Sequence, residues 1–177
     1  MGIFQLRCSN VQLMPFAVGE EAGEEDLFLV EGSQDWCNSL RPPTVDEPTK
    51  TVRVSVQRLD DALAELEVSK VDFIKVDAEG AELYVLYGVM RLLLRKSRPA
   101  ILAEVQDVRT LPWGYAARDI IQFMVRMDYR WFAIAAKGAL CPFPAIRKRT
   151  MRIWWRCRRS VPRSFSVCLG RGRRIHP

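Results

Sequence analysis

The sequence predicts an α/β fold, and three observations support this class. Segments with strand patterns alternate with segments of helical spacing between residues 51 and 135, as in proteins whose parallel strands are joined by helical crossovers. Hydrophobic residues make up 49% of the 177-residue chain, which is enough to bury a core and excludes global disorder. The length suits a single domain.

The charge divides the chain into two parts. Residues 1–146 hold 16 of the 27 Lys and Arg residues and all 21 Asp and Glu residues, which gives a net charge of −5. Residues 147–177 hold the other 11 basic residues and no acidic residue, which gives +11. We therefore predict an acidic domain over 1–146 and a basic, Arg- and Trp-rich tail over 147–177. The division argues against one basic nucleic-acid-binding domain spanning the chain.

The first elements resemble a β-hairpin. Residues 11–18 have a strand pattern that ends at Gly19, and residues 27–30 form a second short apolar run. The acidic residues of 20–26 suit a turn, so a hairpin is the simplest link between the two strands. Residues 31–50 contain several prolines and are expected to form a loop.

Strands and helices then alternate. Residues 51–57 alternate valines with polar residues, which predicts a half-exposed strand. A short helix is expected over 59–66, a buried strand over 71–77 and the clearest helix over 80–96. A buried strand over 100–105, a helix over 115–127 and a final strand over 129–135 complete the series.

Polar residues gather where the predicted strand 71–77 ends. Lys75 and Asp77 are two residues apart in a strand and therefore share a face. Asp77, Glu79 and Glu82 place three carboxylates in one turn. Such a cluster can hold a cationic or hydroxyl-bearing ligand or accept a proton. Alternatively, Asp77 or Glu79 caps the following helix, Glu82 complements its dipole, and Lys75 forms a salt bridge with one of these acids. Ligands of open α/β sheets bind beyond the carboxyl ends of strands, where Glu104 also lies.

Other chemistries are not expected. The only histidine is His176, near the end of the basic tail, and no two of the five cysteines have C-x-x-C spacing. A metal site and a histidine-dependent nucleophile are therefore not predicted. No apolar run approaches the length of a membrane-spanning helix, and we expect a cytoplasmic protein with reduced thiols.

Four segments together resemble the FkbM-type methyltransferases. They are NVQLMPFAVGEEAG (10–23), VSVQRLDDAL (54–63), DFIKVDAEGAELYVLYG (72–88) and RPAILAEV (98–105). The resemblance covers residues 10 to 135, and Asn38 and Ser39 match a polar dipeptide common in the family. It implies a Rossmann-like fold that transfers a methyl group from S-adenosylmethionine to an oxygen of a small molecule or sugar.

The resemblance also implies roles for individual residues. The adenine of the cofactor would touch Ala17, Val18 or Gly19. Asp77 would orient or deprotonate the acceptor hydroxyl, with Lys75 and Glu79 in the same cluster. Glu104 would line the acceptor pocket.

One part of the family pattern is missing. The glycine-rich cofactor loop and its two βα units should precede Asn10 and would take roughly 60 residues. The sequence contains no G-x-G-x-x-G segment. We therefore expect a truncated domain with a partial Rossmann-like sheet, which by itself binds S-adenosylmethionine poorly.

The tail permits several interpretations. It could be a disordered extension, or complete the sheet through 151–155 or 165–169. It could also be an unrelated extension, or contact nucleic acid or an anionic membrane through Arg147–Arg159. A non-catalytic binding module with such a tail is the alternative to an enzyme.

Overall fold

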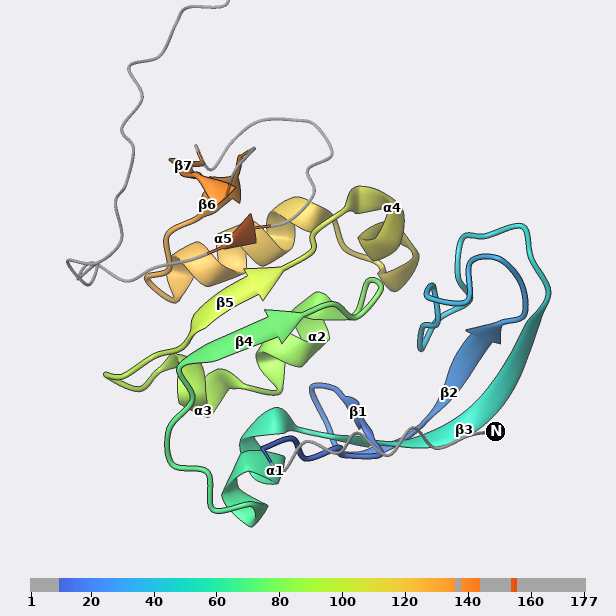
Figure 1. Ribbon diagram of the computed structural model, residues 1–177, viewed down its shortest axis with the longest axis horizontal. Helices are drawn as coiled ribbons and strands as arrows, with labels where there is room; N and C mark the ends of the chain where they lie inside the picture. The colour runs from blue at the N-terminus through green and yellow to red at the C-terminus, as the bar shows by residue number, and fades with distance from the viewer. Residues whose placement is uncertain (1–9, 136–137, 144–153, 156–177) are drawn as a thin grey trace, which may run out of the picture.

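The structure is a computed structural model that describes residues 10–135, 138–143 and 154–155. Its strands form two sheets (Figure 1). The first sheet has the order β1-β3-β2, with β1 at Ala17–Val18, β3 at Thr49–Gln57 and β2 at Gly23–Val30. The second has the order β4-β5-β8-β6-β7, with β4 at Phe73–Val76, β5 at Ala100–Ala103, β8 at Trp154–Trp155, β6 at Phe132–Ile134 and β7 at Leu140–Pro142.

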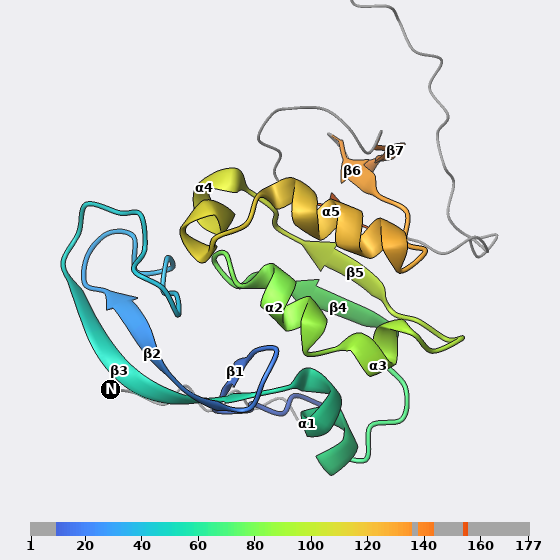
Figure 2. The ribbon, with the colours of Figure 1, turned by 180° about the vertical axis from the view of Figure 1, so that it is seen from behind.

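The helices lie mainly on one side of the second sheet. They are α1 (Leu59–Glu65), α2 (Glu82–Tyr87), α3 (Met90–Leu93), α4 (Asp107–Thr110), the 3-10 helix η1 (Leu111–Trp113) and α5 (Ala117–Arg126). Figure 2 shows α2, α3 and α5 on the same face of β4 and β5. The core lies between these layers and includes the fully buried Leu86, Leu93, Ile120 and Met124.

The α/β class is confirmed, but the described strands do not form one parallel sheet. β4 pairs with β5 in parallel, as expected for strands with a helical crossover, and β1 pairs in parallel with β3. β8 pairs antiparallel with both β5 and β6. Sheet completion by the tail is therefore observed at Trp154–Trp155. The proposed domain boundary at residue 146 falls outside the described residues and stays a prediction.

The predicted hairpin between residues 11–18 and 27–30 is wrong, because β1 and β2 each pair with β3 rather than with each other. β2 pairs antiparallel with β3 over eight residue pairs, from Gly23 with Val56 to Val30 with Thr49. The acidic residues from Gly23 to Asp26 thus belong to a strand, where Arg53 pairs with Glu24 and Asp26. The expectation of a turn was wrong because ion pairs compensate these charges on both strand faces: Arg53 pairs with Glu24 and Asp26 across the strands, and Arg41 pairs with Glu25 on the other face at 3.5 Å.

The predicted strand over residues 11–18 is much shorter than expected. Only Ala17–Val18 forms a strand, whereas Val11 and Leu13 are 50% and 69% exposed. Pro15 lacks a backbone N–H, which removes one bond from any ladder at this place.

The predicted helix over residues 80–96 is divided into α2 and α3 at Gly88 and Val89. The buried carboxylate of Asp60 accepts hydrogen bonds from the backbone N–H groups of Arg91 (2.7 Å) and Leu92 (3.1 Å). These bonds cap α3, and the Asp60 N–H donates to the carbonyl oxygen of Gly88 at 3.0 Å. Asp60, which is remote in the sequence, therefore helps to end α2 and to start α3.

The strand β4 is less buried than its apolar sequence suggests. Its residues alternate, and Phe73 and Lys75 are exposed while Val76 is buried. Within the described residues β4 pairs only with β5, so its other edge faces the first sheet without a partner strand.

Among the residues described, no helix is both long and apolar enough to cross a lipid bilayer.

Candidate functional site

The loop after β4 has a backbone that only particular residues allow. Glu79 and Gly80 both have positive φ angles, 48° and 102°. A Cβ on Gly80 would overlap the carbonyl oxygen of Arg109 and press on the Trp113 ring. Glycine at this position thus allows the loop to pack tightly against α4 and η1.

Glu82 stabilises this loop. Its Oε1 accepts hydrogen bonds from the backbone N–H groups of Ala78 (3.1 Å) and Gly80 (3.2 Å). The side chain is buried, and this burial raises its pKa above the ordinary value, although the backbone donors oppose the shift. Glu82 lies in the first turn of α2, where its charge suits the helix dipole, but its hydrogen bonds hold the loop rather than cap the helix, and its buried Oε2 has no hydrogen-bond partner among the described residues.

Lys75 and Asp77 lie side by side, as their spacing predicts. Their side chains form an ion pair, and this hydrogen bond to Asp77 raises the pKa of Lys75. Both side chains remain accessible, with exposed fractions of 60% and 39%. Asp77 can therefore contact a ligand while Lys75 fixes its orientation.

Glu79 points to a different partner. Its carboxylate lies 3.0 Å from Nε of Arg109, and its carbonyl oxygen accepts a hydrogen bond from the Ser39 hydroxyl at 3.0 Å. Burial raises the pKa of Glu79, with Arg109 opposing the shift. Asn38 accepts a hydrogen bond from the N–H of Val30 at 2.9 Å. The Asn38–Ser39 dipeptide therefore ties the β2–β3 loop to the loop after β4.

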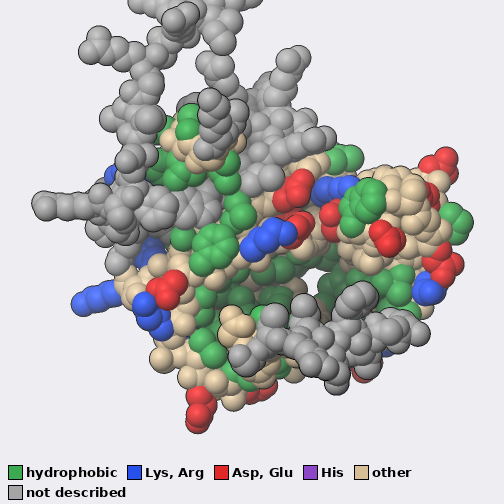
Figure 3. All heavy atoms as spheres, in the orientation of Figure 1, with side chains coloured by type: hydrophobic (Ala, Val, Ile, Leu, Met, Phe, Trp, Pro, Cys, Tyr) green, Lys and Arg blue, Asp and Glu red, His purple; other side chains and the backbone are tan. Residues whose placement is uncertain are grey.

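An inter-sheet cavity of about 300 Å³ separates the two sheets. Figure 3 shows the hollow, with acidic and basic side chains above it. Ala17 and Val18 line one side of this cavity, and Lys75 and Asp77 line the other. The structure thus brings two of the three predicted cofactor residues to the predicted catalytic pair, while Gly19 lines a neighbouring pocket.

An acidic cavity of about 150 Å³ lies on the other side of Asp77. Asp77, Glu79 and Glu104 all line it, and Gln106 donates a hydrogen bond to Glu104. The carboxyl ends of the parallel strands β4 and β5 meet here, as expected for such a sheet. The four predicted catalytic and acceptor residues therefore lie at one edge of the second sheet.

Sequence reasoning missed several residues around this loop. Arg109 pairs with Glu79, while the Tyr115 hydroxyl donates to the carbonyl oxygen of Gly80 and accepts from the N–H of Leu83 at 3.3 Å. Burial raises the pKa of Tyr115, which keeps its hydroxyl protonated as a donor. Arg109 lies in a short helix without a periodic pattern, so no signal in the sequence identified it.

The cluster can bind and orient a hydroxyl group and receive its proton, because carboxylates are hydrogen-bond acceptors and general bases. In the described part of the chain, no group of His, Cys, Asp and Glu side chains has the arrangement of a metal site.

Residues 4–131 match the family described as the methyltransferase FkbM domain, over more than half of the chain. No curated protein and no solved structure gives a significant match.

Proposed function

This chain belongs to the FkbM methyltransferase family, and on this premise we propose that it methylates a hydroxyl oxygen of a small molecule or sugar with S-adenosylmethionine. One observation carries the proposal. Asp77, Glu79 and Glu104 converge on one cavity at the carboxyl ends of two adjacent parallel strands. Family membership supports the methyl transfer, and this cluster supports a hydroxyl acceptor.

The inter-sheet cavity fits part of the cofactor. Ala17 and Val18 offer an apolar wall for the adenine ring, and the carboxylate of Asp77 suits a hydroxyl or cationic group. Among the described residues that line this cavity, Asp77 alone carries a carboxylate, and Lys75 already pairs with it. The fit is therefore adequate for the ring and poor for the ribose. We expect no micromolar binding of S-adenosylmethionine by this chain, measured by calorimetry.

When bound, the cofactor supplies an electrophilic methyl group. The chain itself orients the acceptor: Asp77 accepts the hydrogen bond of the hydroxyl, and Lys75 holds the Asp77 carboxylate in place. Glu104 also lines the acidic cavity, where it can accept a hydrogen bond from a second hydroxyl. Positioning of the acceptor should contribute most to the rate of transfer, and proton removal by Asp77 should raise that rate by a further factor of about 10²–10⁴.

Transfer of labelled methyl groups tests this proposal. The full chain is assayed with excess S-adenosylmethionine and a panel of sugars and hydroxyl-bearing small molecules. Asp77→Asn should lower turnover about 100-fold or more, because the amide cannot accept the proton.

Asp72→Asn is a matched control for this assay. Asp72 precedes β4 and pairs with Lys70 at 2.7 Å, which repeats the Lys75–Asp77 spacing at the other end of the strand. Turnover by Asp72→Asn should equal that of the unaltered chain. Equal turnover in both variants would remove Asp77 from the mechanism, and no transfer by the unaltered chain would overturn the proposed activity.

The charge of the tail favours a second candidate function. Residues 147–177 carry +11, which suits contact with nucleic acid or an anionic membrane by a non-catalytic module. Truncation after Ile146 would also remove β8 from the sheet. A cleaner test replaces Arg147, Arg149, Arg156 and Arg159 with Gln, within the segment expected to make the contact, and measures retention on RNA and on anionic vesicles. Retention that does not change would exclude contact through these arginines.

A further inference from the structure

The acidic cavity carries an excess of negative charge. The described residues that line it include four carboxylates and one cation, Arg109, which is a formal charge of −3. Lys75, which lines the inter-sheet cavity, pairs with Asp77 and reduces this charge to −2. Gln106 donates a hydrogen bond to Glu104 but adds no charge. The cavity should therefore attract a cationic ligand and repel an anionic one.

The buried carboxylate of Glu82 indicates that a ligand belongs in this cavity. Glu82 is 2% exposed, and its Oε1 accepts hydrogen bonds from the backbone N–H groups of Ala78 and Gly80. Its Oε2 is buried and has no hydrogen-bond partner among the described residues. A buried carboxylate oxygen without a donor is costly. Because Glu82 lines the acidic cavity, a hydrogen-bond donor bound there would satisfy this oxygen.

Trp36 adds an exposed aromatic ring to the lining. It lies in the β2–β3 loop and is 67% exposed. The next residue, Cys37, is buried, and its thiol lies 3.2 Å from Nη2 of Arg109. Cys37 therefore fixes this part of the loop beside the cavity while the Trp36 ring stays accessible. The face of a tryptophan ring attracts ammonium groups, because its quadrupole is negative there.

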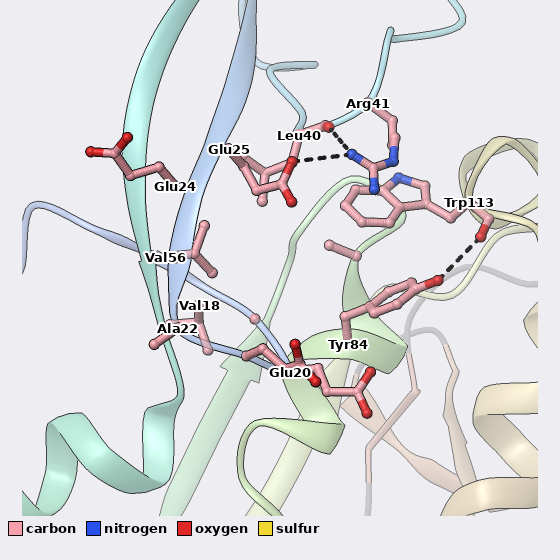
Figure 4. Close-up of a pocket in the computed structure, with 14 residues that line it drawn as sticks. Val18, Glu20, Ala22, Glu24, Glu25, Leu40, Arg41, Val56, Tyr84 and Trp113 are labelled. Atoms are coloured by element: carbon pink, nitrogen blue, oxygen red, sulfur yellow. Dashed lines mark hydrogen bonds and ion pairs between the residues drawn. The ribbon is translucent and has the colours of Figure 1, made fainter.

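The larger neighbouring pocket, of about 280 Å³, has no aromatic face of this kind. Figure 4 shows the Trp113 ring between Arg41 and Tyr84. Arg41 lies 4.9 Å from the centre of the Trp113 ring, and the Tyr84 ring lies 5.3 Å from it on the other side. These side chains already contact one another, whereas the acidic cavity offers both an exposed indole and an unsatisfied carboxylate oxygen.

The chemistry of the acidic cavity favours an ammonium group over a metal ion. In the part of the chain that the structure describes, no His, Cys, Asp and Glu side chains are grouped as a metal ion requires. An ammonium group needs only acceptors at ordinary hydrogen-bond distances, which carboxylates supply. The volume of about 150 Å³ is below the roughly 300–1,000 Å³ that is usual for ligand pockets, so the group bound there is small.

From these features we infer that the acidic cavity binds the protonated amino group of a small amino alcohol. The inference rests on the proposed function and narrows its acceptor class. The ammonium group lies against Trp36 and donates hydrogen bonds to Glu82 and Glu104, where Glu104 accepts it in place of a second hydroxyl.

The hydroxyl group of the same molecule reaches Asp77 directly. Asp77 lines both the acidic cavity and the inter-sheet cavity, so the acceptor does not have to cross the space assigned to the cofactor. A protonated amine has no free electron pair and is not a methyl acceptor. The hydroxyl oxygen therefore forms the new bond to the methyl group, and its proton passes to Asp77.

Saturation-transfer NMR on the full chain, without cofactor, tests this inference at neutral pH. Ethanolamine should give signals from its methylene protons, whereas 1,2-ethanediol and glycolate, which are of similar size but lack the positive charge, should give none. Glu82→Gln removes the charge but keeps an oxygen for the loop, and it should weaken ethanolamine binding about tenfold. Glu31→Gln is the matched control, because Glu31 pairs with Lys50 at 2.8 Å outside the cavity, and it should leave binding unchanged.

A second variant covers loss of folding in Glu82→Gln. Trp36→Ala changes an exposed side chain and should weaken ethanolamine binding roughly threefold. Absence of an ethanolamine signal, an equal signal from 1,2-ethanediol, or unchanged binding in both variants would overturn the inference. Because the assay needs no methyl transfer, its failure is distinct from failure of the proposed activity.

Discussion

The first sheet meets the rest of the molecule in two ways, against the turn between α2 and α3 at one side and across a cavity from β4 at the other. At one side, which we call the closed junction, Gly19, Asp60 and Gly88 bring backbone against backbone, and a Cβ on Gly88 would overlap the carbonyl oxygen of Gly19. At the other side, the open junction, the inter-sheet cavity separates β1 from β4. The backbone contacts that hold the first sheet in place therefore lie apart from the predicted catalytic residues, which lie at the open junction.

The largest effect on stability should come from Asp60→Ala. The substitution leaves the N–H groups of Arg91 and Leu92 without their acceptor in a buried site, which should lower the free energy of unfolding by about 3 kcal/mol. Denaturant titration measures this loss. Asp61→Ala is the matched control, because Asp61 is 47% exposed and its ion pair with Arg91 should contribute less than about 1 kcal/mol. An equal loss of unfolding free energy in both variants would show that the closed junction does not depend on the capping of α3 by Asp60.

Added side-chain volume should also distinguish the two junctions. Gly88→Ala forces the backbones of Gly19 and Gly88 apart and should cost about 2 kcal/mol. Ala17→Leu adds more atoms but places them beside the inter-sheet cavity, so its cost should stay below about 1 kcal/mol. Thermal unfolding of both variants measures the difference. A greater loss for Ala17→Leu would contradict an open junction.

The pH dependence of stability should report on Glu82, which lines the acidic cavity. Burial raises its folded-state pKa, so the folded chain holds this proton more strongly than the unfolded chain. Its contribution is therefore favourable at low pH and is lost as the pH rises from 4.5, the ordinary value, through the raised pKa. The slope for one proton is at most about 1.4 kcal/mol per pH unit. Glu82→Gln should remove this slope from the stability curve, and an unchanged curve would contradict the assignment.

The smallest effect should come from Lys75→Ala. The pair with Asp77 is exposed to solvent, so its loss should change stability by less than about 0.5 kcal/mol. The same variant should lower methyl transfer, since Asp77 loses the group that orients it. A large loss of stability without loss of transfer would make the pair structural.

Local patterns account for the elements that the sequence predicted correctly. Alternation over residues 51–57 matches β3, and the helical pattern over 115–127 matches α5 within two residues at the start and one at the end. The β2–β3 pairing and the break between α2 and α3 were not predicted. They depend on contacts between remote residues, such as Asp60 with the start of α3.

In the candidate site as well, local sequence patterns predicted some residues and did not indicate others. The shared face of Lys75 and Asp77 follows from strand geometry and is observed as an ion pair. Arg109, Trp113 and Tyr115 lie in short or irregular segments, so no periodicity marked them. Cofactor contacts by Ala17, Val18 and Gly19 stay predictions.

The position of β8 has a consequence for the order in which the chain folds during synthesis. Trp154–Trp155 lies between β5 and β6 in the sheet, although the ribosome makes both of those strands first. The hairpin of β6 and β7 can form early from local contacts. It cannot join the sheet until β8 has emerged to pair with both β5 and β6, so the edge of β5 stays open to other chains during translation.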